Sequence, residues 1–188
     1  VGWKKCSWRI GMNRFFKVDS YDLSNYRLSA SQPGIRAFIV IVGIFNLLLL
    51  IPDIINLHDT ALIAVCILRL LYTLICTAFF FSIRKFHSFK ALSVAVTAAE
   101  LLAVAVFLAV FSLYSVPDFM IQLLGIMLVI LLIFMVPNRF VYALSASLLA
   151  AAGFLFIAYK IFGWSDTAQH IASAIYMGAE IAFGSAFA

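Results

Sequence analysis

Three ionisable side chains, Arg69, Glu100 and Glu180, interrupt long apolar runs of the sequence; Glu100 stands in the stretch TAAELLAV. Insertion scales assign about 2.5–3.5 kcal/mol to such a residue at the centre of a membrane-spanning helix, so these residues usually face the bundle interior and pair. One cation and two carboxylates can form an ion pair that holds helices together, or the polar part of a ligand pocket. A proton or ion path is a third alternative, but it needs polar residues across the full thickness of the membrane.

The depth of each group follows from the helical rise of 1.5 Å per residue. Arg69 lies about 12 Å, Glu180 about 15 Å and Glu100 about 22 Å from the outer end of its helix. Arg69 and Glu180 therefore match best as a pair. A long arginine could still reach toward Glu100, which is about a turn and a half deeper.

Polar neighbours of these three groups suggest a lined cavity. Tyr72 shares the helix face of Arg69, Ser173 and Tyr176 share that of Glu180, and Asn46 lies on the first span near the depth of Glu100. The ligand-binding site that we expect consists of Arg69, Glu180, Glu100, Tyr72, Tyr176, Asn46 and Ser173.

Motifs that would indicate an enzyme do not occur in this sequence. We find no glycine-rich phosphate loop, HExxH, CxxC or nucleophile elbow, so we expect no catalytic residue and no cofactor in this region. Aspartates and histidines near the outer helix ends match no metal template in their spacing, so we interpret them as solvated loop residues and expect no metal site. They are Asp53, Asp59, Asp118, Asp166, His58 and His170.

The composition excludes an ordinary soluble domain. Of the 188 residues, 65% are hydrophobic and 11% are charged, and the mean hydropathy is +1.11. Soluble chains average about 45–50% apolar and about 25% charged residues. The chain is therefore predicted to be a membrane protein, with no room for a second soluble domain beside its spans.

A membrane span needs roughly 20 mostly apolar residues, and six runs meet this length. Because their connections are short, sequential helices should run antiparallel as neighbours. We predict an all-α integral membrane bundle of six helices, with spans at about 36–57, 61–83, 91–115, 118–137, 139–162 and 170–188.

The basic residues predict the orientation. Eleven of the 13 lysines and arginines lie before or at the start of the first span, in the second connection, or at the fourth connection, where Arg139 begins the fifth span. By the positive-inside rule, we expect a multi-pass membrane protein with both termini on the cytoplasmic side. The net charge of +5 then indicates contact with anionic lipid of the bilayer and not with nucleic acid.

Residues 1–35 differ from the spans, because WKKCSWRIGMNRFFKV mixes aromatic and basic residues. We expect a cytoplasmic, amphipathic segment against the inner leaflet; a poorly ordered basic tail is the alternative. Asp19-Ser20 could cap a short helix through about Ser31, which Pro33-Gly34 would separate from the first span.

Rows of small residues on the third and fifth spans favour close helix packing. One row is Ala95, Ala99 and Ala103, and the other is Ala143, Ser147 and Ala151. Both contact within one bundle and contact between two chains are compatible with them.

Three short motifs accompany this order of elements: the approach from Tyr26-Arg27 to Arg36, Asp53 near the outer end of the first span, and Pro137-Asn138-Arg139 between the fourth and fifth spans. With them, the chain resembles the six-helix membrane sensor region that precedes GGDEF diguanylate cyclase domains, some adenylate cyclases and some histidine kinases. The resemblance implies a location in a bacterial inner membrane. It implies a dimer, because such cyclase domains act in pairs, and a sixth helix that continues into an output domain. From the start at Val1 and the end at Ala188 we expect a piece of a longer polypeptide.

These observations predict a sensory and dimerisation module that binds a small apolar or amphipathic ligand and controls a cytoplasmic output domain, foremost a diguanylate cyclase. Arg69 would anchor a polar or anionic head, Glu180 would couple the contact to the sixth helix, and Glu100 would set the charge balance. Alternatives are a small transporter or channel, the sensor region of a histidine kinase, and a purely structural anchor.

Overall fold

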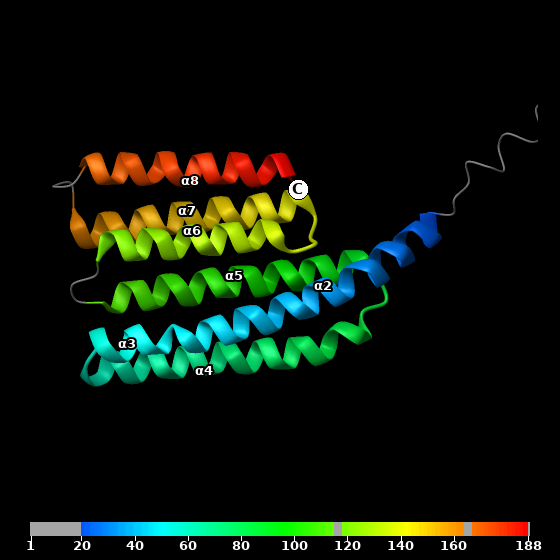
Figure 1. Cartoon of the computed structure of the whole chain (residues 1–188), viewed down its shortest axis with the longest axis horizontal. Coiled ribbons are helices and arrows are strands. Elements are labelled where there is room, and N and C mark those ends of the chain that lie inside the picture. The colour runs from blue at the N-terminus through cyan, green and yellow to red at the C-terminus, as the bar shows by residue number, and fades with distance from the viewer. Residues whose placement is uncertain (1–19, 115–117, 164–166, 188) are drawn as a thin grey trace, which may run out of the picture.

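The structure, a computed structural model, describes residues 20–114, 118–163 and 167–187. This part of the chain is helical and contains no strand, so the prediction of an all-α bundle is confirmed (Figure 1). Its elements are α2 (Ser20–Leu48), α3 (Leu50–Asn56), α4 (Asp59–Ser82), the 3-10 helix η1 (Ile83–Lys85), α5 (Phe89–Leu113), α6 (Phe119–Met135), α7 (Phe140–Phe162) and α8 (Thr167–Phe187).

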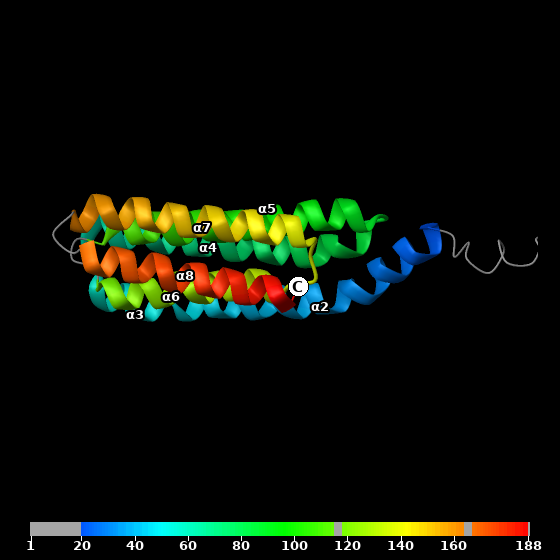
Figure 2. The same cartoon turned by 90° about the horizontal axis from the view of Figure 1, so that it is seen from above.

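The helices form two layers. Figures 1 and 2 together show α4, α5 and α7 in one layer, and α2 with α3, α6 and α8 in the other. Within the first layer α5 packs on α4 and α7, and it also contacts α2 and α6 of the second layer. α5 is therefore the central helix of the bundle. From its own layer it faces the space between α2/α3 and α6 of the other layer.

Local sequence signals determine several helix ends. The Ser88 side chain accepts a hydrogen bond from the Ala91 amide at 3.2 Å. Asp118 Oδ1 accepts from the amides of Met120 and Ile121 at 2.9 and 3.2 Å. Both are N-caps, which satisfy amides that have no partner inside the helix. α7 ends at Phe162 and is followed by Gly163, whose φ of 68° is a conformation that glycine adopts without a Cβ penalty.

Two prolines have different effects on the first span. Pro52 has no amide hydrogen and crowds the carbonyl four residues earlier, which is that of Leu48, the last residue of α2. α3 then begins at Leu50 and carries Asp53. The interruption thus lies beside the residue that α3 contributes to the candidate site.

Pro33, in contrast, does not separate a short helix from the first span. That prediction was wrong, because α2 is continuous from Ser20 through Pro33 to Leu48. Packing holds the chain around the proline: the Gln32 side chain donates to the Ile83 carbonyl at 3.4 Å, and Ile35 and Ile39 are buried. Of the interfacial segment predicted at residues 1–35, residues 1–19 lie outside the described part of the chain, and residues 20–35 belong to α2.

Four helical segments of the described chain are long and apolar enough to cross a membrane, and α6 is a shorter apolar helix. The four are Tyr26–Asn56, Asp59–Lys85, Phe89–Leu113 and Phe140–Phe162. α8, expected as the sixth span, is not among them, because Gln169, His170 and Glu180 dilute a helix rich in alanine. Large apolar side chains such as Ile67, Leu74 and Phe156 are exposed, a surface that is compatible with a membrane.

Two clusters of buried side chains hold the bundle together. One joins α5, α6, α7 and α8, and in it the rings of Phe111 and Phe154 stack with centroids 5.3 Å apart. The other joins α2, α4 and α5. Ala143 and Ser147 are buried on α7, which packs on α5, α6 and α8. This small-residue row therefore serves packing within one bundle.

Candidate functional site

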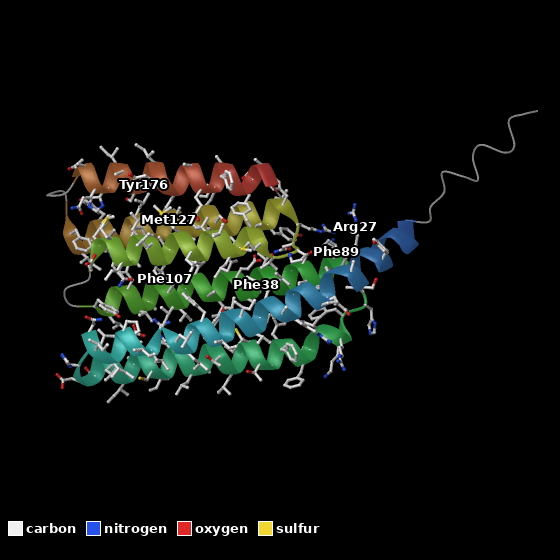
Figure 3. All side chains as sticks on the ribbon, viewed as in Figure 1. Arg27, Phe38, Phe89, Phe107, Met127 and Tyr176 are labelled. Atoms are coloured by element: carbon white, nitrogen blue, oxygen red, sulfur yellow. The ribbon has the colours of Figure 1, made fainter. Side chains whose placement is uncertain are left out.

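An open cavity of about 300 Å³ lies between α2/α3 and α6, with α4 and α5 behind it. Most of its lining is apolar; Figure 3 labels two lining residues, Phe38 on α2 and Phe107 on α5. Phe45 and Ile121 also line it and are exposed at the bundle surface. The cavity therefore opens sideways between α2/α3 and α6. Binding sites for small molecules are typically mostly apolar concavities with a few placed polar groups.

A buried polar cluster borders the cavity near the α3 end. The Arg69 Nε donates to Asp53 Oδ2 in a salt bridge, and Arg69 Nη1 donates to Asn46 Oδ1 at 3.1 Å. In return, Asn46 Nδ2 donates to the Arg69 carbonyl at 2.9 Å and to Thr73 Oγ1 at 3.0 Å. Three helices, α2, α3 and α4, are thus joined by one hydrogen-bond network.

Tyr114, which follows the last residue of α5, completes this cluster. Its hydroxyl donates to Asp53 Oδ1 at 2.7 Å. A phenol is protonated at neutral pH, so Tyr114 is a donor and both oxygens of Asp53 have partners.

The burial of this cluster makes its pairing essential. Asp53 is 1% exposed and Arg69 is 6% exposed, and a charge removed from water in this way requires a counter-charge and hydrogen bonds. Because Asp53 compensates Arg69 directly, the pair as a whole presents no net charge to the cavity. The arrangement can orient an uncharged polar group of a ligand but offers little to an anion.

A second cluster of polar side chains, formed around Glu100, borders the same cavity nearer the opposite end of the bundle. Asn138 Nδ2, from the connection between α6 and α7, lies 3.3 and 3.2 Å from the two Glu100 oxygens and donates to Thr97 Oγ1 at 2.8 Å. Glu100 is 6% exposed. Among the described residues the Arg69–Asp53 contact is the one salt bridge, so an amide and not a cation holds Glu100.

The structure brings together four of the seven predicted site residues. Asn46, Arg69, Tyr72 and Glu100 line the cavity. The other three belong to α8 and do not line it: Ser173 is buried and donates to the His170 carbonyl at 2.9 Å, Tyr176 is exposed, and Glu180 is half-buried.

The predicted pairing of Arg69 with Glu180 is wrong. α4 packs on α2, α3 and α5, whereas α8 packs on α6 and α7, and Figure 1 shows α4 and α8 at opposite edges of the bundle. Equal depth in the membrane therefore did not mean lateral proximity. Arg69 pairs instead with a residue on the helix that precedes its own.

The interpretation of Asp53 as a solvated loop residue is also wrong. Asp53 lies on the last turns of the first span and points into the bundle, where its carboxylate meets Arg69 and Tyr114. Tyr114 and Asn138 are site residues that the sequence analysis did not predict. Asn138 stands in the Pro137-Asn138-Arg139 turn, but this position alone does not reveal its contact with Glu100.

No group of three potential metal ligands was found among the described histidine, cysteine, aspartate and glutamate residues. Comparison of the chain with protein-family models, with curated proteins and with solved structures found no match. The function is therefore argued from the cavity and its polar groups.

Proposed function

We propose that this chain is a transmembrane sensory and dimerisation module of a bacterial signalling protein, and that it binds a small, mainly apolar molecule. The observation that carries this proposal is the open cavity between α2/α3 and α6, which combines an apolar lining with two buried polar groups. Its volume of about 300 Å³ is at the lower end of the range typical of ligand sites.

The ligand that fits this cavity has an uncharged polar head. Arg69 is already compensated by Asp53, and Glu100 adds a carboxyl group at the other polar position. A free anion would meet no unpaired cation among the described lining residues. Of the polar or anionic head expected for an Arg69 anchor, we therefore propose the polar one: a hydroxyl or carbonyl group that can bind to Gln122 or Tyr72, which also line the cavity.

Transmission of the signal would pass through α6. This helix lines the cavity on one side and packs on α8 on its other side. A Cβ added at Gly184 of α8 would lie 2.4 Å from the side chain of Phe134 of α6, so the Phe134 ring packs directly against the α8 backbone. A ligand that binds one α6 position more tightly shifts the population toward that position, and α8 follows.

The remaining parts of the proposal rest on the sequence. The basic residues at one end of the bundle support an inner-membrane location with cytoplasmic termini. The resemblance of Tyr26-Arg27, Asp53 and Pro137-Asn138-Arg139 to cyclase-linked sensor regions supports a homodimer and a diguanylate cyclase output. Adenylate cyclases and histidine kinases are the other outputs of such regions.

The cavity is tested by filling it. Ala99 lines the cavity and is half-buried, whereas Ala98, its neighbour on α5, is exposed and does not line it. We expect Ala99→Leu to abolish ligand binding and Ala98→Leu, the matched control, to leave it unchanged. The measurement is the melting temperature of the chain in neutral detergent with 1-decanol or with decanoate at pH 8.

We expect decanol to raise the melting temperature of the unmodified chain and of Ala98→Leu, since a ligand at 100-fold above its Kd stabilises by about 2.7 kcal/mol. Decanoate should stabilise much less, because the described lining offers no unpaired cation. If Ala99→Leu responds to decanol as strongly as Ala98→Leu, the molecule binds elsewhere and the proposed site is wrong.

A further inference from the structure

A second, smaller cavity lies on the outer surface of α2 and α4, away from the ligand cavity. It measures about 220 Å³ and is lined by Arg36 of α2, by Phe80 and Phe81 of α4, and by Arg84 of η1. Two guanidinium groups and two aromatic rings thus surround one concave site. The site lies at the basic end of the bundle, which also carries Arg27 (Figure 3).

Neither arginine of this site has a carboxylate partner in the part of the chain that the structure describes, where the one salt bridge is the contact of Arg69 with Asp53. The Arg36 guanidinium lies 5.6 Å from the centroid of the Phe80 ring, and its Nε is buried without a hydrogen-bond partner among the described residues. The site therefore has positive charge that no carboxylate of the described residues compensates, while the ring holds the guanidinium in place.

We propose that Arg36 and Arg84 bind the phosphate group of an anionic phospholipid. A guanidinium presents a planar fork of donors that matches the oxygens of a phosphate. Basic pockets between helices on the cytoplasmic side of a membrane are suited to lipid head groups. This inference goes beyond the proposed ligand cavity, because it uses other residues and another surface.

The surface next to the site favours a lipid over free phosphate. Phe81 is 69% exposed, although it lies beside two charged groups. Val40 and Ile44 follow Arg36 at four-residue spacing on the same face of α2, and they are 45% and 56% exposed. An acyl chain can extend along this apolar strip while its phosphate stays at the arginines.

The test compares lipid affinities of variants of the whole chain in neutral detergent, by native mass spectrometry with phosphatidylglycerol or phosphatidylcholine. We expect Arg36→Gln/Arg84→Gln to bind phosphatidylglycerol about tenfold or more weakly. Arg36→Lys keeps the charge but loses the fork and ring contact, so it should fall between. The matched control, Arg27→Gln/Lys90→Gln, removes two exposed charges from the same end and should change the affinity far less.

Three results would overturn the proposal. Equal weakening in the control variant would mean that the whole basic end attracts lipid diffusely. Equal affinity for phosphatidylcholine would mean that the site does not recognise anionic lipid. Displacement of phosphatidylglycerol by millimolar inorganic phosphate would mean that the site takes the free ion. If the double variant does not fold, Arg84→Gln alone, at an exposed residue, decides between these outcomes.

Discussion

The buried ion pair of Asp53 and Arg69 yields the sharpest stability prediction. Asp53→Asn keeps the shape of the side chain and its contact with Tyr114 but removes the negative charge. The charged hydrogen bond from Arg69 that is lost contributes about 1.5–3 kcal/mol. Because Arg69 is only 6% exposed, its charge also stays buried and uncompensated. Breaking such a pair costs about 3–5 kcal/mol in total, and we expect this decrease in the free energy of unfolding.

A double-mutant cycle separates the pairing from other effects of the substitutions. Arg69→Met should also be strongly destabilising, because it leaves the Asp53 carboxylate buried without its cation. Asp53→Asn/Arg69→Met removes both charges, so its cost should fall short of the sum of the single costs by about 2 kcal/mol or more. The measurement is reversible unfolding in mixed micelles. Asp59→Asn, at an exposed aspartate of the neighbouring helix start, is the control and should be nearly neutral.

Strict additivity of the two single substitutions would refute this reasoning, since it would mean that the side chains do not interact energetically. Single costs below about 1 kcal/mol, the range of exposed ion pairs, would contradict the burial of the pair. Either result would also mean that Asp53 does not neutralise the charge that Arg69 presents to the cavity.

Two further changes test the second polar group and the packing of α6 on α8. Asn138→Ala should lower the free energy of unfolding by about 1–3 kcal/mol, because the buried Glu100 loses its hydrogen-bond donor. In the same unfolding assay, Glu100→Gln/Asn138→Ala should recover part of that loss. No recovery would contradict the contact between Asn138 and Glu100. Gly184→Ala should cost about 1–3 kcal/mol through overpacking against Phe134. Gly178→Ala on the same helix, where an added Cβ meets nothing within 4 Å, should be neutral or stabilising in parallel melts; equal effects at both glycines would contradict the close approach.

The fold was predictable because each helix is specified by nearby residues. Apolar runs of about membrane length located α4, α5, α6 and α7, and the predicted spans 118–137 and 139–162 agree with the bounds of α6 and α7 to within about two residues. The error at Pro33 has a physical cause. Local rules predict a break at a proline, but contacts of Gln32 and Ile35 with residues distant in sequence hold the helix together.

The site was less predictable, because it depends on which helices lie side by side. Helical rise predicted the depth of Arg69 and Glu180 but contains no information on lateral order. Asp53 lay near a helix end, where an aspartate is usually solvated, and a sequence pattern cannot show that Tyr114 folds over it. The charge inside α4 was correctly interpreted as one that needs a partner; the partner came from the preceding helix.

The position of the cavity determines how binding could act on the rest of the bundle. Each helix of the second layer is supported by the first layer, but α2/α3 and α6 are separated by the cavity. Filling this space adds contacts to α6 on the side opposite α8. Because Phe134 of α6 packs tightly against Gly184 of α8, we expect a shift of α6 to move α8 with it. Glu180 lies on α8 and does not line the cavity. We therefore expect Glu180→Gln to leave the decanol-induced rise in melting temperature unchanged, and a lost rise would contradict the position of the binding site.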